Sequence, residues 1–295
     1  MTHRLDCNAP RETLVARAFL AACEDELAAP KPGNVHVFAP GHGMEAEDFV
    51  KSARAAAPFL AAPGLRVGAR ILKAVEATWT AVGQNTNLGI VLLCAPLAQA
   101  ALLGESGELR AGVSRVLHDL DREDADAAFK AIALARPAGL GRAQEHDVAA
   151  PASVTLLEAM RAAAHRDRVA FQYTHDFRDV FETGLAALEN SRRAGEARRL
   201  TILRVYLAFL CAFPDSHVFR KFGAAASETL LAEARDFAAG VAATRDENQA
   251  FDAALRWDAS LKARGLNPGT GADLVVATLF ADYLARILAN GSKNG

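Results

Sequence analysis

The sequence predicts an all-α fold, built as a single globular domain of many helices. Apolar residues recur at three- and four-residue steps along most of the 295-residue chain, which is the spacing of one helix face. Hydrophobic residues make up 51% of the chain, and the many alanines among them favour helices and close helix packing. Strand signals are nearly absent. Only residues 169–174 combine β-branched and aromatic side chains, and a single strand has nothing to pair with.

The expected helices follow one another along the whole chain. In the third of them Val67, Ile71 and Val75 share one face, and in the last Leu274 and Leu288 bound a similar stripe. Loops with proline and glycine, at 29–42, 134–151 and 265–271, interrupt the series because these residues end helices. The periodicity predicts helices at 11–28, 47–60, 67–78, 88–103, 121–135, 153–164, 176–189, 198–212, 227–240, 245–263 and 274–288.

The domain organisation is expected to be simple. No stretch is long, charged or low in complexity enough to serve as an interdomain linker. No period of 20 to 50 residues recurs, which argues against a solenoid. We therefore expect one domain over residues 1–295, with disorder in residues 1–10.

Composition and charge limit the classes of function. The net charge of -2 and an isoelectric point near 6.5 favour neither nucleic acid nor an anionic membrane, so phosphate binding requires a local site. Four cysteines without CxxC spacing argue against zinc and disulfides and suit a reducing cytoplasm. The N-terminal residues lack the apolar core of a signal peptide, and the longest apolar stretch, 90–103, is too short to span a bilayer. We expect a cytoplasmic protein.

The loop after the first helix contains Lys31, Gly33 and Asn34. Its prolines stiffen the backbone, while Gly33 can turn with positive φ and approach a ligand closely. Lys31 can present a point charge to a phosphate. A plain helix-ending loop with a solvated lysine explains the same residues. His42 lies between two glycines, so a packing role does not explain a histidine at this position. It is therefore a candidate catalytic group.

A polar segment, Asn85-Thr86-Asn87, precedes Leu88, Gly89 and an apolar run. One of the three polar residues can cap the helix that follows. One cap is enough for one helix, so the others, at a helix N-terminus, suit an anion or a ribose hydroxyl. Upstream, Glu76 lies on a helix patterned for burial. Glutamate is rarely buried unless it is paired or binds a metal, so Glu76 is a candidate base or metal ligand.

Further candidates lie in the second half of the chain. Asp147 follows a glycine-rich loop and is a candidate metal ligand. Residues 166–168 form a charged cluster for which solvent exposure is the commoner outcome. A segment of Asp215, Ser216 and His217 invites comparison with a catalytic triad, but no nucleophile elbow is present. The polar residues that complete the predicted site are Asp215, His217, Lys221, Asn267, Gly269, Thr270 and Asp273; Asp215 and Asp273 are candidate metal ligands among them.

Taken in order, these motifs resemble the triphosphoribosyl-dephospho-CoA synthase family, from about residue 18 to residue 280. The resemblance implies an all-helical fold and a Mg²⁺-dependent glycosyl transfer. ATP would lose adenine, and its triphosphoribosyl group would join the ribose 2′-hydroxyl of 3′-dephospho-CoA by an α bond. Such an inverting displacement needs a carboxylate base for the acceptor and a proton donor for the leaving base. The ordered motifs are Glu26, Pro30–Val35, Gly41–Met44, Phe49, Ser52, Gly68, Glu76–Thr78, Asn85–Gly89, Gly139–Gly141, Asp215–His217 and Asn267–Leu274.

The chain departs from the citrate-lyase type of this family at three motifs. Asn34 and His36 replace a leucine and an aspartate, Gly43 replaces a carboxylate, and Asn87-Leu88 replaces His-Lys. The variants are similar to a branch found in archaea and methylotrophs. That branch suggests a role in making a C1-carrier coenzyme such as tetrahydromethanopterin or methylofuran.

The leading hypothesis is a Mg²⁺-dependent (phospho)ribosyl transferase with ATP or phosphoribosyl pyrophosphate as donor. Its partner is a small nucleotide rather than nucleic acid or membrane, and a homodimer is possible. In this reading Glu76, Asp215 and His42 are catalytic, and Glu76, Asp147, Asp215 and Asp273 are the metal ligands. A hydrolase of ADP-ribose-type glycosides and a helical nucleotide-binding protein without catalysis are the alternatives.

Overall fold

The computed structural model describes residues 9–104, 108–142, 145–244 and 246–291. The predicted disorder at 1–10 falls outside these ranges except for its last two residues. Within the described ranges the chain forms helices, and its β-structure is limited to two isolated bridges, His36 with Ala39 and Gly41 with Met44. The all-α prediction is confirmed, while the number of domains stays a prediction.

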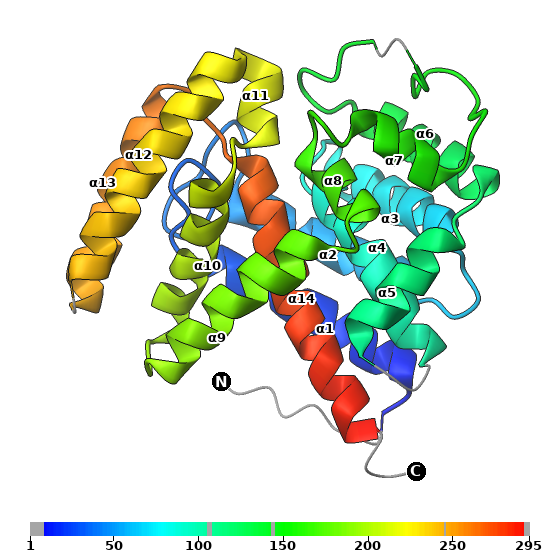
Figure 1. The fold of residues 1–295 in the computed structure, drawn as a ribbon, viewed down its shortest axis with the longest axis horizontal. Helices are drawn as coiled ribbons and strands as arrows, with labels where there is room; N and C mark the ends of the chain where they lie inside the picture. The colour runs from blue at the N-terminus through cyan, green and yellow to red at the C-terminus, as the bar shows by residue number, and fades with distance from the viewer. Residues whose placement is uncertain (1–8, 105–107, 143–144, 245, 292–295) are drawn as a thin grey trace.

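Fourteen α-helices and one π-helical segment are present in the described residues (Figure 1). Three short helices, α5, α8 and α11, lie outside the predicted series. In chain order the elements are α1 (Arg11–Leu27), α2 (Ala46–Leu60), α3 (Val67–Val82), α4 (Leu88–Leu103), α5 (Leu109–His118), α6 (Arg122–Ala135), α7 (Leu156–Ala163), α8 (Arg168–Thr174), η1 (Asp179–Gly184), α9 (Leu185–Arg193), α10 (Arg198–Ala212), α11 (Ser216–Phe222), α12 (Ala224–Ala243), α13 (Glu247–Ala263) and α14 (Gly269–Gly291).

The strand-like segment at 169–174 is a helix, α8. Its N-cap is Asp167, whose carboxylate accepts hydrogen bonds from the backbone N–H groups of Val169 and Ala170. Because the capping side chain satisfies two N–H groups that a helix start leaves unpaired, it outweighs the strand preference of the β-branched and aromatic residues. The expected helix at 176–189 also differs, since it starts as the π-helical η1 before it continues as α9.

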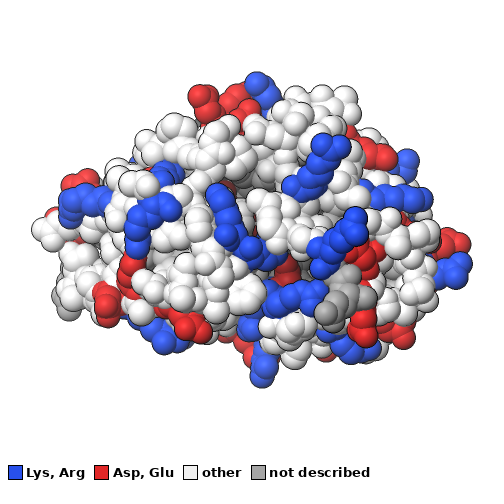
Figure 2. Space-filling view, turned by 90° about the horizontal axis from the view of Figure 1, so that it is seen from above, with Lys and Arg blue, Asp and Glu red and all other residues white. Residues whose placement is uncertain are grey.

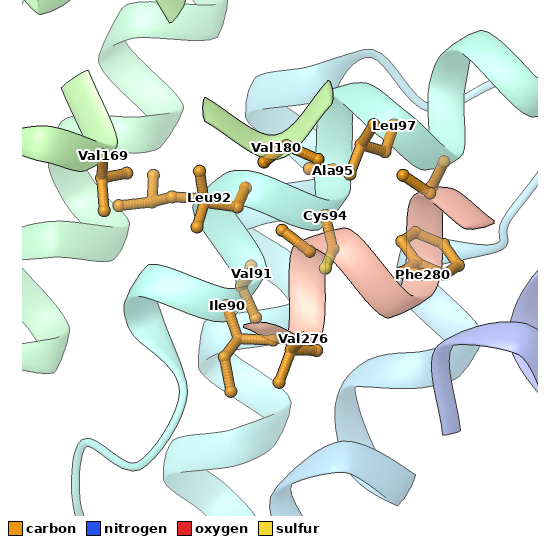
Figure 3. Packing of buried hydrophobic residues seen from close by; sticks show 14 of the residues in the cluster. Ile90, Val91, Leu92, Cys94, Ala95, Leu97, Val169, Val180, Val276 and Phe280 are labelled. Atoms are coloured by element: carbon orange, nitrogen blue, oxygen red, sulfur yellow. The ribbon is translucent and has the colours of Figure 1, made fainter. Parts of the chain in front are cut away.

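The centre of the molecule is α14, which runs diagonally through the ribbon of Figure 1 and packs on α1, α4 and α10. The other central element is α4, which is almost entirely apolar and mostly buried. In Figure 3, Cys94 of α4 lies beside the ribbon of α14 that carries Val276 and Phe280, while Leu92 points towards Val169 of α8. These two helices place their N-terminal ends close to each other, and the candidate site lies there.

At the other side of the fold, α12 and α13 form an outer pair along one edge (Figure 1). Smaller apolar clusters, such as Leu203 and Leu207 of α10 against Val241 of α12 and Ala254 of α13, attach this pair to the rest. Within the described residues, no single helix is long and apolar enough to cross a membrane; α10 and α11 pass such a test only together, across a 53° bend.

We expect Gly68→Ala to lower the free energy of unfolding by about 1–3 kcal/mol, the usual cost of overpacking. A Cβ at residue 68 would lie 2.4 Å from the Cα of Asp124 and 2.5 Å from its carbonyl oxygen, and neither backbone atom can move aside. Urea unfolding followed by circular dichroism measures the change. Gly240→Ala is the control, because no atom lies within 4 Å of its Cβ position and alanine should stabilise α12. Equal stability changes of the same sign would contradict the prediction.

Candidate active site

A cavity of about 850 Å³ opens between α11 and the loop that joins α6 to α7, and reaches the N-terminal ends of α4 and α14. In Figure 2, Lys and Arg side chains stand around a hollow near the centre of the face seen from above. We call Arg142, Arg166 and Arg220 the rim, because they line the outer part and none of them is buried. We call the buried polar lining the floor, which consists of Glu26, Asn34, Thr86, Asn87, Asn267 and Thr270. Apolar side chains such as Phe49, Phe129 and Met160 line the walls.

The N-terminal end of α4 is held by side chains of the segment 85–87. The side-chain Oδ1 of Asn85 accepts from the Leu88 N–H at 3.2 Å and so satisfies the first N–H group of α4. The Asn87 amide donates to the Thr78 hydroxyl at 3.0 Å, and the hydroxyls of Thr86 and Ser52 lie 2.5 Å apart. One residue of the segment thus has the capping role that the sequence allowed, and all three residues line the cavity.

Gly89 and Asp273 bring the ends of α4 and α14 together. A Cβ at residue 89 would lie 2.0 Å from the Asp273 carboxylate, so only glycine allows this approach. The Asp273 carboxylate lines the cavity, and burial raises its pKa well above the ordinary value. The partial positive charge at the N-terminus of α4 favours a carboxylate here, which opposes the effect of burial.

The Asp215 carboxylate joins α11 to α14. One oxygen caps α11 by accepting from the N–H groups of His217 and Val218, at 2.9 and 3.1 Å, and the other accepts from the Gly271 N–H at 2.9 Å. Burial raises the pKa of Asp215 to about 6, although these backbone hydrogen bonds lower it. Asp215 does not line the cavity, and the structure gives it a structural task in place of the predicted base or metal ligand.

His217, two residues further on, does line the cavity. Its Nδ1 would lie 2.4 Å from a Cβ at residue 269, so Gly269 provides the room for the ring. Burial lowers the pKa of His217 to about 4, and the neighbouring Arg220 and Lys221 add to the shift. The ring is therefore neutral at neutral pH, so one of its nitrogens can donate a hydrogen bond and the other can accept one.

The loop at 31–35 packs against the loop that starts α14. The Asn34 amide donates to the Asn267 side-chain oxygen at 2.8 Å, and the Gly33 N–H donates to Asp258 at 2.9 Å. Gly33 has a φ of +85°, and a Cβ there would lie 2.7 Å from Pro268. Two segments that are more than 230 residues apart in the chain therefore form one floor.

Lys31 is fully buried beneath this floor. Its ammonium pairs with Glu26 at 3.1 Å and donates to the carbonyl oxygen of Val35. Burial lowers the pKa of Lys31 and raises the pKa of Glu26, while each partner opposes the shift of the other. The expectation that Lys31 meets a phosphate is wrong for this side chain, because protein oxygens already satisfy its charge.

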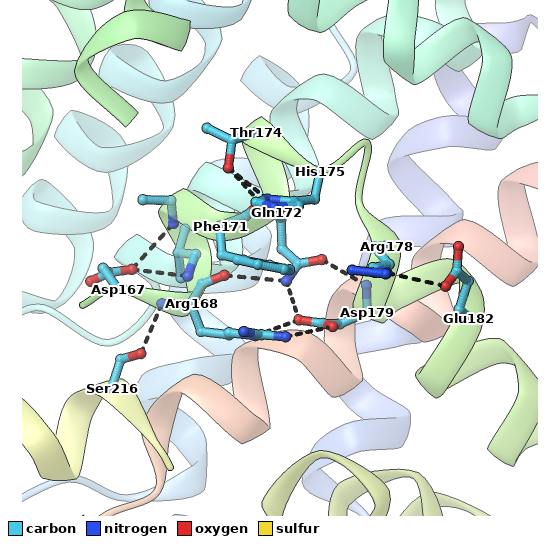
Figure 4. A network of polar contacts seen from close by, with 12 residues as sticks. Asp167, Arg168, Phe171, Gln172, Thr174, His175, Arg178, Asp179, Glu182 and Ser216 are labelled. Carbon is cyan, nitrogen blue, oxygen red and sulfur yellow. Dashed lines mark hydrogen bonds and ion pairs between the residues drawn. The ribbon is translucent and has the colours of Figure 1, made fainter. Parts of the chain in front are cut away.

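A polar network fixes α8, which carries the other wall of the cavity (Figure 4). Arg168 forms a bidentate pair with Asp179 of η1 at 2.6 and 2.9 Å, and its backbone N–H donates to Ser216 of α11. Next to it, Asp167 accepts from Arg220 of the rim at 2.6 Å. The bidentate pair holds α8 against η1 in one orientation. The hydrogen bonds of Ser216 and Arg220 hold α8 against α11.

Comparison with known proteins identifies the family. The family model described as ATP:dephospho-CoA triphosphoribosyl transferase matches residues 12–292. The chain belongs to this family. It is accordingly an enzyme of the transferase class. A crystal structure from Archaeoglobus fulgidus, provisionally assigned as a triphosphoribosyl-dephospho-CoA synthase, shares the fold with a TM-score of 0.60 and 24% identity, over 78% of this chain and 95% of that one. No match to a curated protein is found.

Most of the predicted site residues of this transferase meet in the cavity, but several do not. Glu76 is exposed on α3, so the premise of a buried glutamate was wrong. His42 is occupied by a 2.8 Å contact between its Nε2 and the carbonyl oxygen of Gly33. Lys221 is exposed and lies over the ring of Phe222. The predicted residues that line the cavity are Asn34, Asn85, Thr86, Asn87, Gly89, Asp147, His217, Asn267, Gly269, Thr270 and Asp273.

The positively charged residues that line the transferase cavity were not predicted from the sequence. The charged cluster was expected to be exposed, and Arg166 is exposed, but Arg166 and Asp167 also line the cavity, as do Arg142 and Arg220. An available signal was Asp167 itself, an N-cap residue type placed before an apolar run, which implies a helix start rather than a solvated charge cluster. Glu26 was quoted as part of a motif but received no role.

The predicted metal ligands of the transferase do not gather. Among the described residues, no group of three or more His, Cys, Asp or Glu side chains is placed to hold a metal ion. Only Asp147 and Asp273 of the four predicted ligands line the cavity. Mg²⁺ commonly takes one or two carboxylates and completes its shell with waters and substrate phosphates. The residues present therefore fit a Mg²⁺ that arrives with a phosphate substrate and do not fit a metal held by protein alone.

Proposed function

We propose that the chain transfers the triphosphoribosyl group of ATP, with Mg²⁺, to a hydroxyl of 3′-dephospho-CoA or of a related coenzyme precursor. The observation that carries this proposal is the polarity of one cavity, whose cationic rim surrounds a buried floor of neutral and acidic polar groups. Membership of the transferase family supports the same reading.

Each part of the cavity suits one part of this donor. The rim arginines suit a triphosphate, since guanidinium groups pair with phosphate oxygens in a bidentate way. The apolar walls, with Phe49 and Phe129, suit the adenine ring, and the neutral amides of the floor suit ribose hydroxyls. Bound Mg²⁺ would neutralise phosphate charge, with Asp273 and Asp147 as the carboxylates that would hold it.

The decisive experiment is incubation of the protein with ATP, MgCl₂ and 3′-dephospho-CoA, followed by mass spectrometry. We expect free adenine and an adduct of triphosphoribose with the acceptor. Parallel reactions with phosphoribosyl pyrophosphate as donor, and with precursors of tetrahydromethanopterin or methylofuran as acceptors, distinguish the related transferases. Release of a ribose product with water as the sole acceptor would favour the glycoside hydrolase. Absence of nucleotide binding by calorimetry would favour a protein without catalysis.

We expect Arg220→Met to raise the KM for ATP by roughly 10- to 100-fold, because a hydrogen-bonded charge pair to phosphate contributes about 1.5–3 kcal/mol. Lys221→Met is the matched control. It removes a positive charge one residue away, from a side chain that lies outside the cavity, and should leave KM nearly unchanged. Steady-state kinetics at low and high salt measure both variants. Equal effects of the two substitutions would show that net charge, rather than the rim, attracts the nucleotide.

A further inference from the structure

Glu26 stands out among the acidic groups of the cavity. It lies in the last turn of α1 with 4% of its surface exposed, less than any other described carboxylate that lines the cavity, since Asp147, Asp167 and Asp273 are half-buried. Asp167 is committed to Arg220 and to the N-terminus of α8, and Glu145 is exposed. Burying a carboxylate at the floor of a substrate cavity costs desolvation free energy. A functional role would explain why a carboxylate is present there despite this cost.

The surroundings of Glu26 hold its carboxylate in one orientation. Its Oε1 lies 3.1 Å from the Lys31 ammonium, which does not line the cavity and is anchored on the carbonyl oxygen of Val35. Within the described residues, no hydrogen bond reaches Oε2. The pair thus places a cation behind the carboxylate and leaves the second oxygen for a ligand on the cavity side.

The other side chains of the floor are neutral amides and hydroxyls. Asn34 is fixed by its hydrogen bond to Asn267, and Thr270 stands at the start of α14. Such groups can orient a hydroxyl without changing its charge, and a hydroxyl bound among them needs a proton acceptor before it can attack.

We propose that Glu26 is the general base that accepts the proton of the attacking acceptor hydroxyl, with Lys31 as a positioning residue. This rests on the proposed function. In the step, the acceptor oxygen forms a bond to C1′ of the donor ribose while the C1′–N9 bond breaks and its electron pair leaves with adenine. The hydroxyl proton moves to Glu26 Oε2, and adenine takes up one proton from solvent. When Glu26 later returns its proton to solvent, the exchange is balanced.

The electrostatics agree with this role. Burial raises the pKa of Glu26, and the ammonium of Lys31 moderates the rise. A base works best when its pKa lies near the operating pH, above that of an ordinary exposed glutamate.

The test uses azide, an anionic nucleophile that needs no base. We expect Glu26→Gln to slow adenine release from ATP with 3′-dephospho-CoA by roughly 10²- to 10⁴-fold, the usual worth of a general base. Sodium azide should restore adenine release in Glu26→Ala, which has room for the anion, and yield a triphosphoribosyl azide visible by mass spectrometry. Glu24→Gln, an exposed glutamate on the same helix, is the control and should behave as the unmodified protein.

Because removal of Glu26 leaves Lys31 unpaired, the double variant Glu26→Gln/Lys31→Met is measured as well. It keeps the buried site neutral, and circular dichroism reports whether it is folded. A folded variant that retains activity within about threefold, or that gains no adenine release from azide in the Glu26→Ala/Lys31→Met form, overturns the assignment of Glu26. If the unmodified protein releases no adenine with any acceptor, the transferase proposal itself fails, and this inference fails with it.

Discussion

Replacing Lys31 with methionine is expected to lower the free energy of unfolding by about 3–5 kcal/mol, the cost of breaking a buried ion pair by removing one partner. The ammonium is fully buried and faces Glu26 at 3.1 Å, so the substitution leaves a carboxylate in a site with 4% exposure. Adding Glu26→Gln should recover most of the loss, because both charges are then absent. Chemical denaturation of the two single variants and the double variant measures the coupling.

The loss in Lys31→Met should depend on pH in a defined direction. Without the ammonium, burial raises the pKa of Glu26 further above its unfolded value. An acid whose folded pKa is raised contributes stability below its unfolded pKa and loses that contribution as the pH rises through the folded pKa. The variant should therefore be closer in stability to the unmodified protein at pH 5 than at pH 8. A loss independent of pH and not recovered in the double variant would mean that packing, rather than charge, causes it.

Asp215→Ala is expected to destabilise the fold by about 2–4 kcal/mol and to abolish most of the transferase activity. The substitution removes the acceptor of three backbone N–H groups and disconnects α11 from Gly271 of α14. His217 on α11 and Asn267 before α14 would then no longer be held at a fixed distance from each other. We therefore expect the activity to be lost. Thermal unfolding and adenine release measure the two effects.

Asp246→Ala serves as the control for Asp215→Ala. Asp246 also caps a helix by accepting from two backbone N–H groups, but it is exposed and lies far from the cavity lining. Loss of an exposed cap costs about 1 kcal/mol, without an effect on activity. If the two variants lose similar stability and both stay active, Asp215 is an ordinary cap and not a joint between two parts of the site.

The fold was predictable from the sequence because helix periodicity is a local property. A short helix such as α11 has too few residues to show the helical period, so no helix was predicted there. At 169–174 a β-like composition was outweighed by one capping residue, Asp167. Whether such a segment forms a helix or a strand can depend on a single hydrogen-bonding side chain, and the amino-acid composition of the segment does not show this.

Much of the site was predictable because many of its residues lie where helices begin. Asn85, Asn87, Thr270 and their neighbours were found because polar groups at helix N-termini are unusual in an apolar protein. Arg166 was not, because an arginine on a surface and an arginine on the rim of a cavity look alike in a sequence. Burial misled in the opposite sense for Glu76, whose helix has a buried face that does not include it. These distinctions depend on tertiary packing.

The contact between the two ends of the chain has a consequence for biosynthesis. Phe19 of α1 packs edge-on against Phe280 of α14, with ring centroids 5.8 Å apart. The floor of the cavity also needs both ends of the fold, because Asn34 hydrogen-bonds to Asn267. Since α14 follows all the other described helices along the chain, neither the core nor the cavity can close before α14 has been synthesised. Contacts between residues so far apart in the chain form slowly, so the earlier helices stay without their central packing partner until α14 joins them.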